Sequence, residues 1–138
     1  LLQYDYHSGI NKVITDLNNL YKTQPALYQK QFTGEGFEWI NYSDHQNAVL
    51  SYIRKGNNPD ENLIVVCNFT QVVRENYRIG IPQKGKLQEI FNSDAAIYGG
   101  SGLGNGSTLK IEELAYDGRD FSVELLLPAL SVGVYSLV

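Results

Sequence analysis

The hydrophobic and polar positions of the chain follow two different periods, one typical of a helix and one typical of strands. Between residues 10 and 21, apolar side chains recur three, four and seven positions apart and fall within an arc of roughly 120°. This apolar helix face consists of Ile10, Val13, Ile14, Leu17, Leu20 and Tyr21. The spacing predicts one amphipathic helix with Ser8 as its N-cap and Pro25 beyond its end, after which residues 25–28 can form one further turn.

From Phe37 onward the pattern changes to short runs of strand-forming residues separated by turn residues. About eight strands are predicted, at residues 37–42, 48–54, 62–69, 77–81, 86–91, 108–112, 121–127 and 132–138. Residues 63–67 are apolar at every position, which indicates a central strand buried on both faces. Short strands with no helical pattern between them indicate an antiparallel β-sandwich. The expected fold class is therefore mainly β, preceded by one helix.

Composition agrees with a folded globular domain. The chain has 138 residues, of which 43% are hydrophobic and 19% charged, so it can bury a core without disulfides. A net charge of −4 argues against binding to nucleic acid, and no apolar run approaches the roughly 18 residues of a membrane span. The single cysteine, Cys67, excludes an internal disulfide and favours a cytoplasmic location. The absence of methionine indicates a processed chain or a part of a longer protein.

No pattern of residues predicts a catalytic, metal or cofactor site. Two histidines and one cysteine are too few for an ordinary zinc site. The glycine-rich residues 98–106 lack the spacing and the following helix of a dinucleotide-binding loop, and Leu87 replaces the Ser or Thr of a P-loop after residues 80–86. These stretches are predicted to be a structural loop and a hairpin. Cys67, among apolar neighbours, is predicted to be an inert thiol, and the acidic pairs lie in or beside turns.

Aromatic side chains are the one candidate for ligand contact. Exposed rings can stack on sugars, although half or more of the rings here are expected to pack in the core or at its rim. The pool consists of Trp39, Tyr42, Tyr52, Tyr77 and Tyr98. Of these, Trp39, Tyr42 and Tyr98 are the candidate sugar contacts.

Short blocks of residues along nearly the whole chain carry a specific resemblance. The blocks are residues 1–4, 7–9, 16–21, 25–27, 36–40, 47–50, 65–70, 77–82, 89–94, 98–105 and 127–132. In this order they resemble the end of the catalytic barrel and the C-terminal β-domain of bacterial 1,4-α-glucan (glycogen) branching enzymes of glycoside hydrolase family 13.

The resemblance implies a division of the chain and a non-catalytic role. Residues 1–31 would be the last helical segment of a (β/α)8 barrel with its linker, and residues 32–138 the C-terminal all-β sandwich domain. Enzymes of this family cut an α-1,4 glucan, hold it as a covalent glycosyl-enzyme and transfer it to a 6-hydroxyl. Their catalytic carboxylates lie in the barrel, so no catalytic residue, metal or cofactor is carried over. The implied partners are the barrel and α-glucan, and self-association through the apolar helix face is a further expectation.

Two alternatives remain open from the sequence. The chain could be a free-standing carbohydrate-binding β-sandwich module, although the leading helix speaks against this. It could also be the C-terminal domain of another family 13 enzyme, such as a debranching enzyme or an amylase. The blocks at residues 67–70 and 98–105 favour a branching enzyme.

Overall fold

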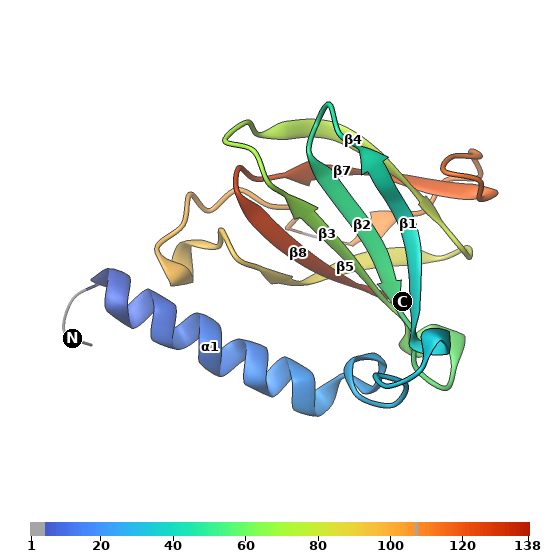
Figure 1. The fold of residues 1–138 in the computed structure, drawn as a ribbon. Helices are drawn as coiled ribbons and strands as arrows, with labels where there is room; N and C mark the ends of the chain where they lie inside the picture. Colours follow the sequence, from blue (N-terminus) through green and yellow to red (C-terminus); the bar gives the residue numbers. More distant parts are fainter. Residues whose placement is uncertain (1–4, 107) are drawn as a thin grey trace.

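The computed structural model describes residues 5–106 and 108–138, which form one helix beside two antiparallel sheets (Figure 1). The first block of the family resemblance, residues 1–4, therefore lies outside the described residues. The helix and the short 3₁₀ turns are α1 (Asp5–Thr23), η1 (Pro25–Leu27), η2 (Gly34–Gly36), η3 (Pro59–Glu61) and η4 (Ala96–Tyr98). The strands are β1 (Phe37–Asp44), β2 (Val49–Arg54), β3 (Leu63–Asn68), β4 (Arg74–Ile81), β5 (Lys86–Asn92), β6 (Leu109–Lys110), β7 (Phe121–Leu127) and β8 (Ser131–Leu137).

The strands form a sandwich of unequal sheets. One sheet has six strands in the order β1-β2-β3-β8-β5-β6, and the other pairs β4 with β7. All strand pairs are antiparallel. The predicted mainly β fold, an antiparallel sandwich preceded by one helix, is confirmed. The central strand predicted at residues 63–67 is also confirmed, because β3 lies between β2 and β8.

The hydrophobic core fills the space between the two sheets. On β3, Ile64 and Val66 face this core, and Ile53 and Tyr135, the cross-strand partners of Ile64, are also buried there. The two-stranded sheet closes the core with Ile79, Ile81, Val123, Leu125 and Leu127. Alternation along each strand leaves the intervening side chains on the opposite, outer face of the six-stranded sheet.

The outer face of the six-stranded sheet is also apolar, and α1 packs on it (Figure 1). Val13 and Leu20 of the helix join a second cluster with Val65, Phe91 and Val134 of the sheet. The rest of the apolar helix face stays largely exposed. Its exposed fractions are 57% for Ile10, 55% for Ile14, 41% for Leu17 and 45% for Tyr21. The helix is therefore docked along one edge of its apolar face and open along the other.

The first turns of α1 are held by a loop of the sandwich. A Cβ atom at Gly9 would lie only 2.4 Å from the carbonyl oxygen of Tyr98, so only glycine allows this approach. The Tyr98 hydroxyl donates a hydrogen bond to Asp16 Oδ2 at 2.6 Å. The prediction of Ser8 as N-cap is wrong, because Ser8 lies inside α1. At its other end, the helix stops at Thr23 and Pro25 opens η1, as the sequence predicts.

Two strands differ from the sequence expectation. β4 begins at Arg74 rather than at residue 77, because a register shift between Arg74 and Tyr77 lets polar residues continue the pairing with β7. β6 contains only Leu109 and Lys110, since the chain then crosses to the other sheet, where Glu112 pairs with Ser122. The turn at residues 82–85 was predicted to be a hairpin, but it joins β4 and β5 of different sheets.

Candidate functional site

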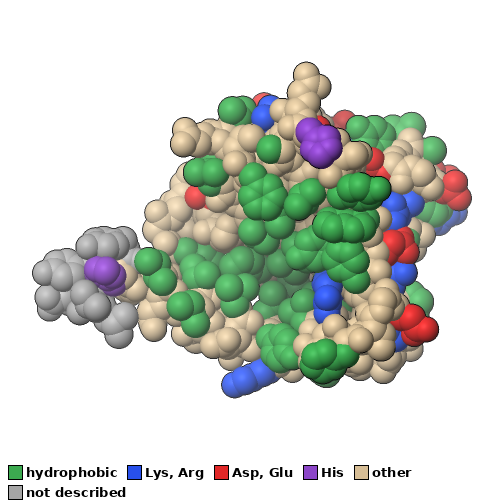
Figure 2. Space-filling model, viewed as in Figure 1, with side chains coloured by type: hydrophobic (Ala, Val, Ile, Leu, Met, Phe, Trp, Pro, Cys, Tyr) green, Lys and Arg blue, Asp and Glu red, His purple; other side chains and the backbone are tan. Residues whose placement is uncertain are grey.

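An open apolar groove runs between α1 and the outer face of the six-stranded sheet. Its volume is about 390 Å³. It is lined by Leu17, Leu20, Tyr21, Leu27, Phe37, Tyr52, Arg54, Val65, Val132 and Val134. Figure 2 shows hydrophobic side chains gathered around a hollow between the helix and the sheet. The groove is therefore a large apolar surface to which helix and strands contribute together.

An aromatic cluster continues the groove along the edge strand β1. The ring centroids of Phe37 and Trp39 lie 4.9 Å apart, and those of Trp39 and Tyr42 lie 5.5 Å apart. Tyr52 of β2, the cross-strand partner of Trp39, packs 5.1 Å from Phe37. Trp39 is 43% exposed and Tyr42 is 62% exposed, so both rings present a face to solvent.

A local irregularity of β1 places Trp39 and Tyr42 in contact. In a regular strand, residues three positions apart point to opposite faces of the sheet. Here the register with β2 shifts between Trp39 and Asn41 and again between Asn41 and Asp44. Such bulges re-aim side chains, and they bring the two rings together. The sequence suggested both residues as sugar contacts, but it gave no sign of the bulge that joins them.

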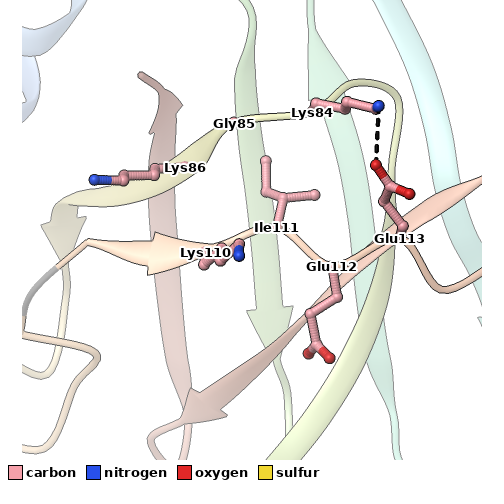
Figure 3. Close-up of a pocket in the computed structure, with 7 residues that line it drawn as sticks. All are labelled: Lys84, Gly85, Lys86, Lys110, Ile111, Glu112 and Glu113. Atoms are coloured by element: carbon pink, nitrogen blue, oxygen red, sulfur yellow. Dashed lines mark ion pairs between the residues drawn. The ribbon is translucent and has the colours of Figure 1, made fainter.

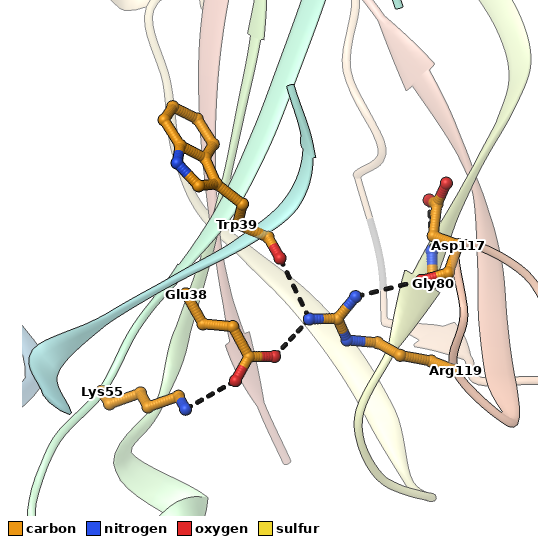
Figure 4. Close-up of polar contacts among 6 residues, drawn as sticks. All are labelled: Glu38, Trp39, Lys55, Gly80, Asp117 and Arg119. Carbon is orange, nitrogen blue, oxygen red and sulfur yellow. Dashed lines mark hydrogen bonds and ion pairs between the residues drawn. The ribbon is translucent and has the colours of Figure 1, made fainter. Parts of the chain in front are cut away.

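Charged residues hold this part of β1 against the turn before β7 (Figure 4). Lys55 Nζ donates to Glu38 Oε1 at 2.7 Å, and Arg119 pairs with the other oxygen of the same carboxylate. Arg119 Nη2 also donates to the carbonyl oxygen of Trp39 at 3.1 Å. The hydrogen bond from Lys55 lowers the pKa of Glu38, with a smaller contribution from Arg119, against an opposing effect of burial. The indole of Trp39 points away from these charges.

Asn41, the paired residue between the two register shifts of β1, is fixed by Asp117. Asn41 Nδ2 donates to Asp117 Oδ1 at 3.1 Å, and the backbone N–H of Gly80 donates to Asp117 Oδ2 at 3.0 Å. A Cβ at Gly80 would lie 2.3 Å from the carbonyl oxygen of Tyr116, so this turn packs directly on β4. The aromatic cluster therefore rests on a backbone that is tied to both sheets.

A small hollow extends the aromatic cluster toward β3. Its volume is about 290 Å³, and Tyr42, Asp44, His45 and Phe69 are among its lining residues. Burial opposes ionisation of Asp44, but hydrogen bonds from Tyr77 and Asn47 outweigh it and leave the pKa of this carboxyl below its usual value. The hollow thus combines exposed rings with a charged hydrogen-bond acceptor.

The third candidate sugar contact, Tyr98, lies elsewhere. Tyr98 belongs to η4, which follows β5 near one edge of the six-stranded sheet. Trp39 and Tyr42 lie on β1, the strand at the other edge. The Tyr98 ring packs 5.7 Å from that of Phe91. Burial, together with the hydrogen bond to Asp16, raises the pKa of Tyr98 to about 12. Both the ring and the hydroxyl of Tyr98 are therefore used in docking α1.

Asn105 ties the end of the glycine-rich stretch at residues 98–106 to β7. Asn105 Oδ1 accepts from the backbone N–H of Leu126 at 2.8 Å, and Asn105 Nδ2 donates to the carbonyl oxygen of Leu126 at 3.0 Å. The same Nδ2 lies within hydrogen-bond distance of Glu89 Oε1 and of the Tyr135 hydroxyl. The amide thus pairs with β7 as a neighbouring strand would, and the loop is part of the scaffold.

A further hollow of about 700 Å³ lies beside β5 and β6 (Figure 3). Lysines and glutamates surround it, and Lys84 forms an ion pair with Glu113 at 2.9 Å.

Within residues 5–106 and 108–138, no group of three or more His, Cys, Asp or Glu could hold a metal ion. Burial raises the pKa of the Cys67 thiol, which keeps it neutral. In the same part of the chain, no helix is long and apolar enough to cross a membrane.

Comparison with known proteins gives consistent matches. A family model described as the alpha-amylase C-terminal all-beta domain matches residues 39–138. A protein of Marinobacter nauticus is 48% identical over 133 residues, which cover 96% of this chain and 21% of the relative. Proteins of Aquifex aeolicus and Thermosynechococcus vestitus are 44% and 46% identical, over 96% and 99% of this chain and 21% and 18% of the relatives. All three are named 1,4-alpha-glucan branching enzyme GlgB, and the chain spans about a fifth of their length.

Proposed function

The chain belongs to the family of alpha-amylase C-terminal all-beta domains, and on that premise we propose that it is the non-catalytic C-terminal domain of a 1,4-α-glucan branching enzyme. In this proposal, residues 1–31 form the last helical segment of the catalytic barrel with its linker, and residues 32–138 form the domain that braces the barrel. The observation that carries the proposal is the apolar groove between α1 and the sheet, which lies uncovered. The unpaired Cys67 supports a cytoplasmic location for the enzyme.

The apolar helix face explains why the groove needs a cover. Ile10, Ile14, Leu17 and Tyr21 are each between 41% and 57% exposed. Full burial of one such side chain stabilises a protein by about 1.5–3 kcal/mol relative to full exposure, so covering the face yields a substantial part of that for each residue. Contiguous apolar patches of this kind mark interfaces. Neighbouring elements of a catalytic barrel would supply the matching apolar surface.

The test compares two tyrosines by hydroxyl-radical footprinting of the intact branching enzyme that carries this chain. Tyr21 lines the groove and Tyr116 lies in the turn before β7, and each is 45% exposed. The two tyrosines match in residue type and exposed fraction, so an uncovered groove would let hydroxyl radicals oxidise both at the same rate. We expect Tyr21 to be oxidised about tenfold more slowly than Tyr116 because the barrel covers it.

Equal oxidation of the two tyrosines would contradict the bracing role and favour a free-standing module. Self-association through the apolar helix face is the other way to protect Tyr21. Dilution distinguishes coverage by the barrel from coverage by a second copy. Protection of Tyr21 by a second copy weakens as the protein concentration falls, whereas protection by a domain of the same chain does not. Protection that disappears on dilution would therefore replace the barrel by a second copy as the partner.

A second proposed role is contact with α-glucan through Trp39 and Tyr42. The observation that favours it is the bulge of β1, which presents both rings on one surface beside the hollow that contains Asp44 and His45. Adjacent exposed rings with polar groups at their margin suit the flat apolar faces and hydroxyl edges of glucose units. Tyr98 is not part of this proposal, because its ring and hydroxyl already contact Phe91 and Asp16.

Glucan binding can be tested by affinity electrophoresis of the intact enzyme through gels that contain glycogen. The variants Trp39→Ala and Tyr42→Ala are each expected to weaken binding at this surface by about tenfold, which corresponds to about 1.4 kcal/mol. Phe32→Ala is the matched control, because Phe32 is 92% exposed and is absent from the aromatic cluster. Unchanged retardation of both variants would show that the rings do not contact glucan.

A further inference from the structure

Arg54 lines the groove without an acidic partner among the residues that the structure describes. Arg78 forms ion pairs with Glu112 and Glu124, and Arg119 pairs with Glu38. Arg74 also forms no ion pair among the described residues, but it lies outside the groove and its charge helps to lower the pKa of Asp44. For Arg54, the part of the chain that the structure describes supplies no hydrogen bond or ion pair.

The surroundings of Arg54 make its lack of a partner significant. The residue ends β2 and lines the groove, and its cross-strand neighbours are Phe37 on one side and Leu63 on the other. Its Nε atom is shut off from solvent and has no hydrogen-bond partner. A guanidinium group remains charged at every physiological pH. Covering the groove with a purely apolar surface would leave this charge buried and unpaired, which is strongly unfavourable.

We propose that the surface which covers the groove carries one aspartate or glutamate that pairs with Arg54 inside an otherwise apolar contact. The inference rests on the proposed function, because it takes the catalytic domain of the same enzyme as the occupant of the groove. A carboxylate fits best, since it can accept two parallel hydrogen bonds from a guanidinium group. Such a pair fixes the register of an apolar interface that would otherwise tolerate sliding.

Cross-linking of the intact enzyme identifies the partner directly. In the variant Arg54→Lys, a carbodiimide can join the introduced amine to a carboxylate in contact with it. The pairs Lys55–Glu38 and Lys84–Glu113, at 2.7 and 2.9 Å, are internal positive controls. We expect peptide mass spectrometry to find position 54 joined to one aspartate or glutamate outside residues 1–138. A cross-link to an acidic residue within the chain, or none while both controls form, would overturn the inference.

The variant Arg54→Met gives an independent answer. Removing one partner of a buried ion pair destabilises the protein, because the other charge is left alone. A paired Arg54 therefore predicts a lower melting temperature for the intact Arg54→Met enzyme. An unpaired Arg54 predicts an equal or higher melting temperature, and that result would overturn the inference.

Footprinting of Tyr21 distinguishes a missing ion pair at Arg54 from a groove that the catalytic domain does not cover. If Tyr21 is protected but position 54 has no acidic partner, the catalytic domain covers the groove and only the ion pair is wrong. If Tyr21 is as reactive as Tyr116, the covering itself is wrong. Replacing the carboxylate found by cross-linking with its amide adds a further check. Its effect on the melting temperature should be less than additive with that of Arg54→Met, as expected for residues in contact.

Discussion

Shortening Ile64 to alanine is expected to lower the free energy of unfolding by about 2–5 kcal/mol. Ile64 is fully buried on the central strand β3, where it faces the core between the sheets. Its cross-strand partners are Ile53 on β2 and Tyr135 on β8, which are each only 1% exposed. The Ile64→Ala substitution removes apolar contacts in three adjacent strands at once and leaves a cavity that rigid strand pairing cannot close.

The measurement is urea unfolding of Ile64→Ala and of a matched control, Ile97→Ala. Ile97 lies in η4 and is 60% exposed, so the same chemical change there should alter the free energy of unfolding by no more than about 0.5 kcal/mol. A lower midpoint with an unchanged slope would identify the effect as one on stability. Equal midpoints for the two variants would contradict the assignment of the core to the space between the sheets.

Replacing Asn105 by alanine is expected to cost about 2–3 kcal/mol, which is large for a polar residue of a loop. The Asn105 side chain hydrogen-bonds both the N–H and the carbonyl oxygen of Leu126. It also contacts the hydroxyl of Tyr135, a residue that is 1% exposed. Asn105→Ala removes the hydrogen bonds to Leu126 of β7 and Tyr135 of β8 together, and it releases the end of the glycine-rich stretch from β7.

Asn18→Ala serves as the control for Asn105→Ala. Asn18 is exposed on α1, where alanine favours the helix, so the control should be neutral or slightly stabilising. Asn105→Asp sharpens the comparison, because it keeps an acceptor for the Leu126 N–H but loses the donors and places a carboxylate beside Glu89. It should destabilise the protein at neutral pH. If thermal unfolding finds Asn105→Ala no worse than Asn18→Ala, the loop is not anchored through this amide.

The sequence predicted those features that depend on local periodicity. The 3.6-residue spacing of the apolar helix face located α1, and the proline at position 25 located its end. The wholly apolar run within β3 indicated a strand covered on both faces, which the sandwich and the helix together provide. Such patterns are readable because each face of a helix or strand meets one kind of environment along its length.

The features that the sequence did not predict depend on contacts between distant residues. Ser8 has the residue type of an N-cap, yet it lies inside α1, beside the glycine that approaches Tyr98. Nothing in the spacing of Trp39 and Tyr42 indicates the bulge that puts their rings in contact. In the sequence, Arg54 is an ordinary charged residue at the end of a predicted strand, and only the structure shows that it lines the groove. The bulge and the groove are products of tertiary packing.

The position of β8 in the larger sheet has a consequence for biosynthesis. This strand, Ser131–Leu137, comes after every other strand along the chain, yet it lies between β3 and β5 in the middle of the sheet. Until β8 has left the ribosome, β3 and β5 each expose an unpaired, apolar edge. Pairing of these two strands with β8 then closes long loops of chain. A chain interrupted before Ser131 therefore keeps two open edges, which are features that chaperones and proteases encounter in unfinished proteins. The larger sheet can therefore be completed only after Ser131–Leu137 has been translated.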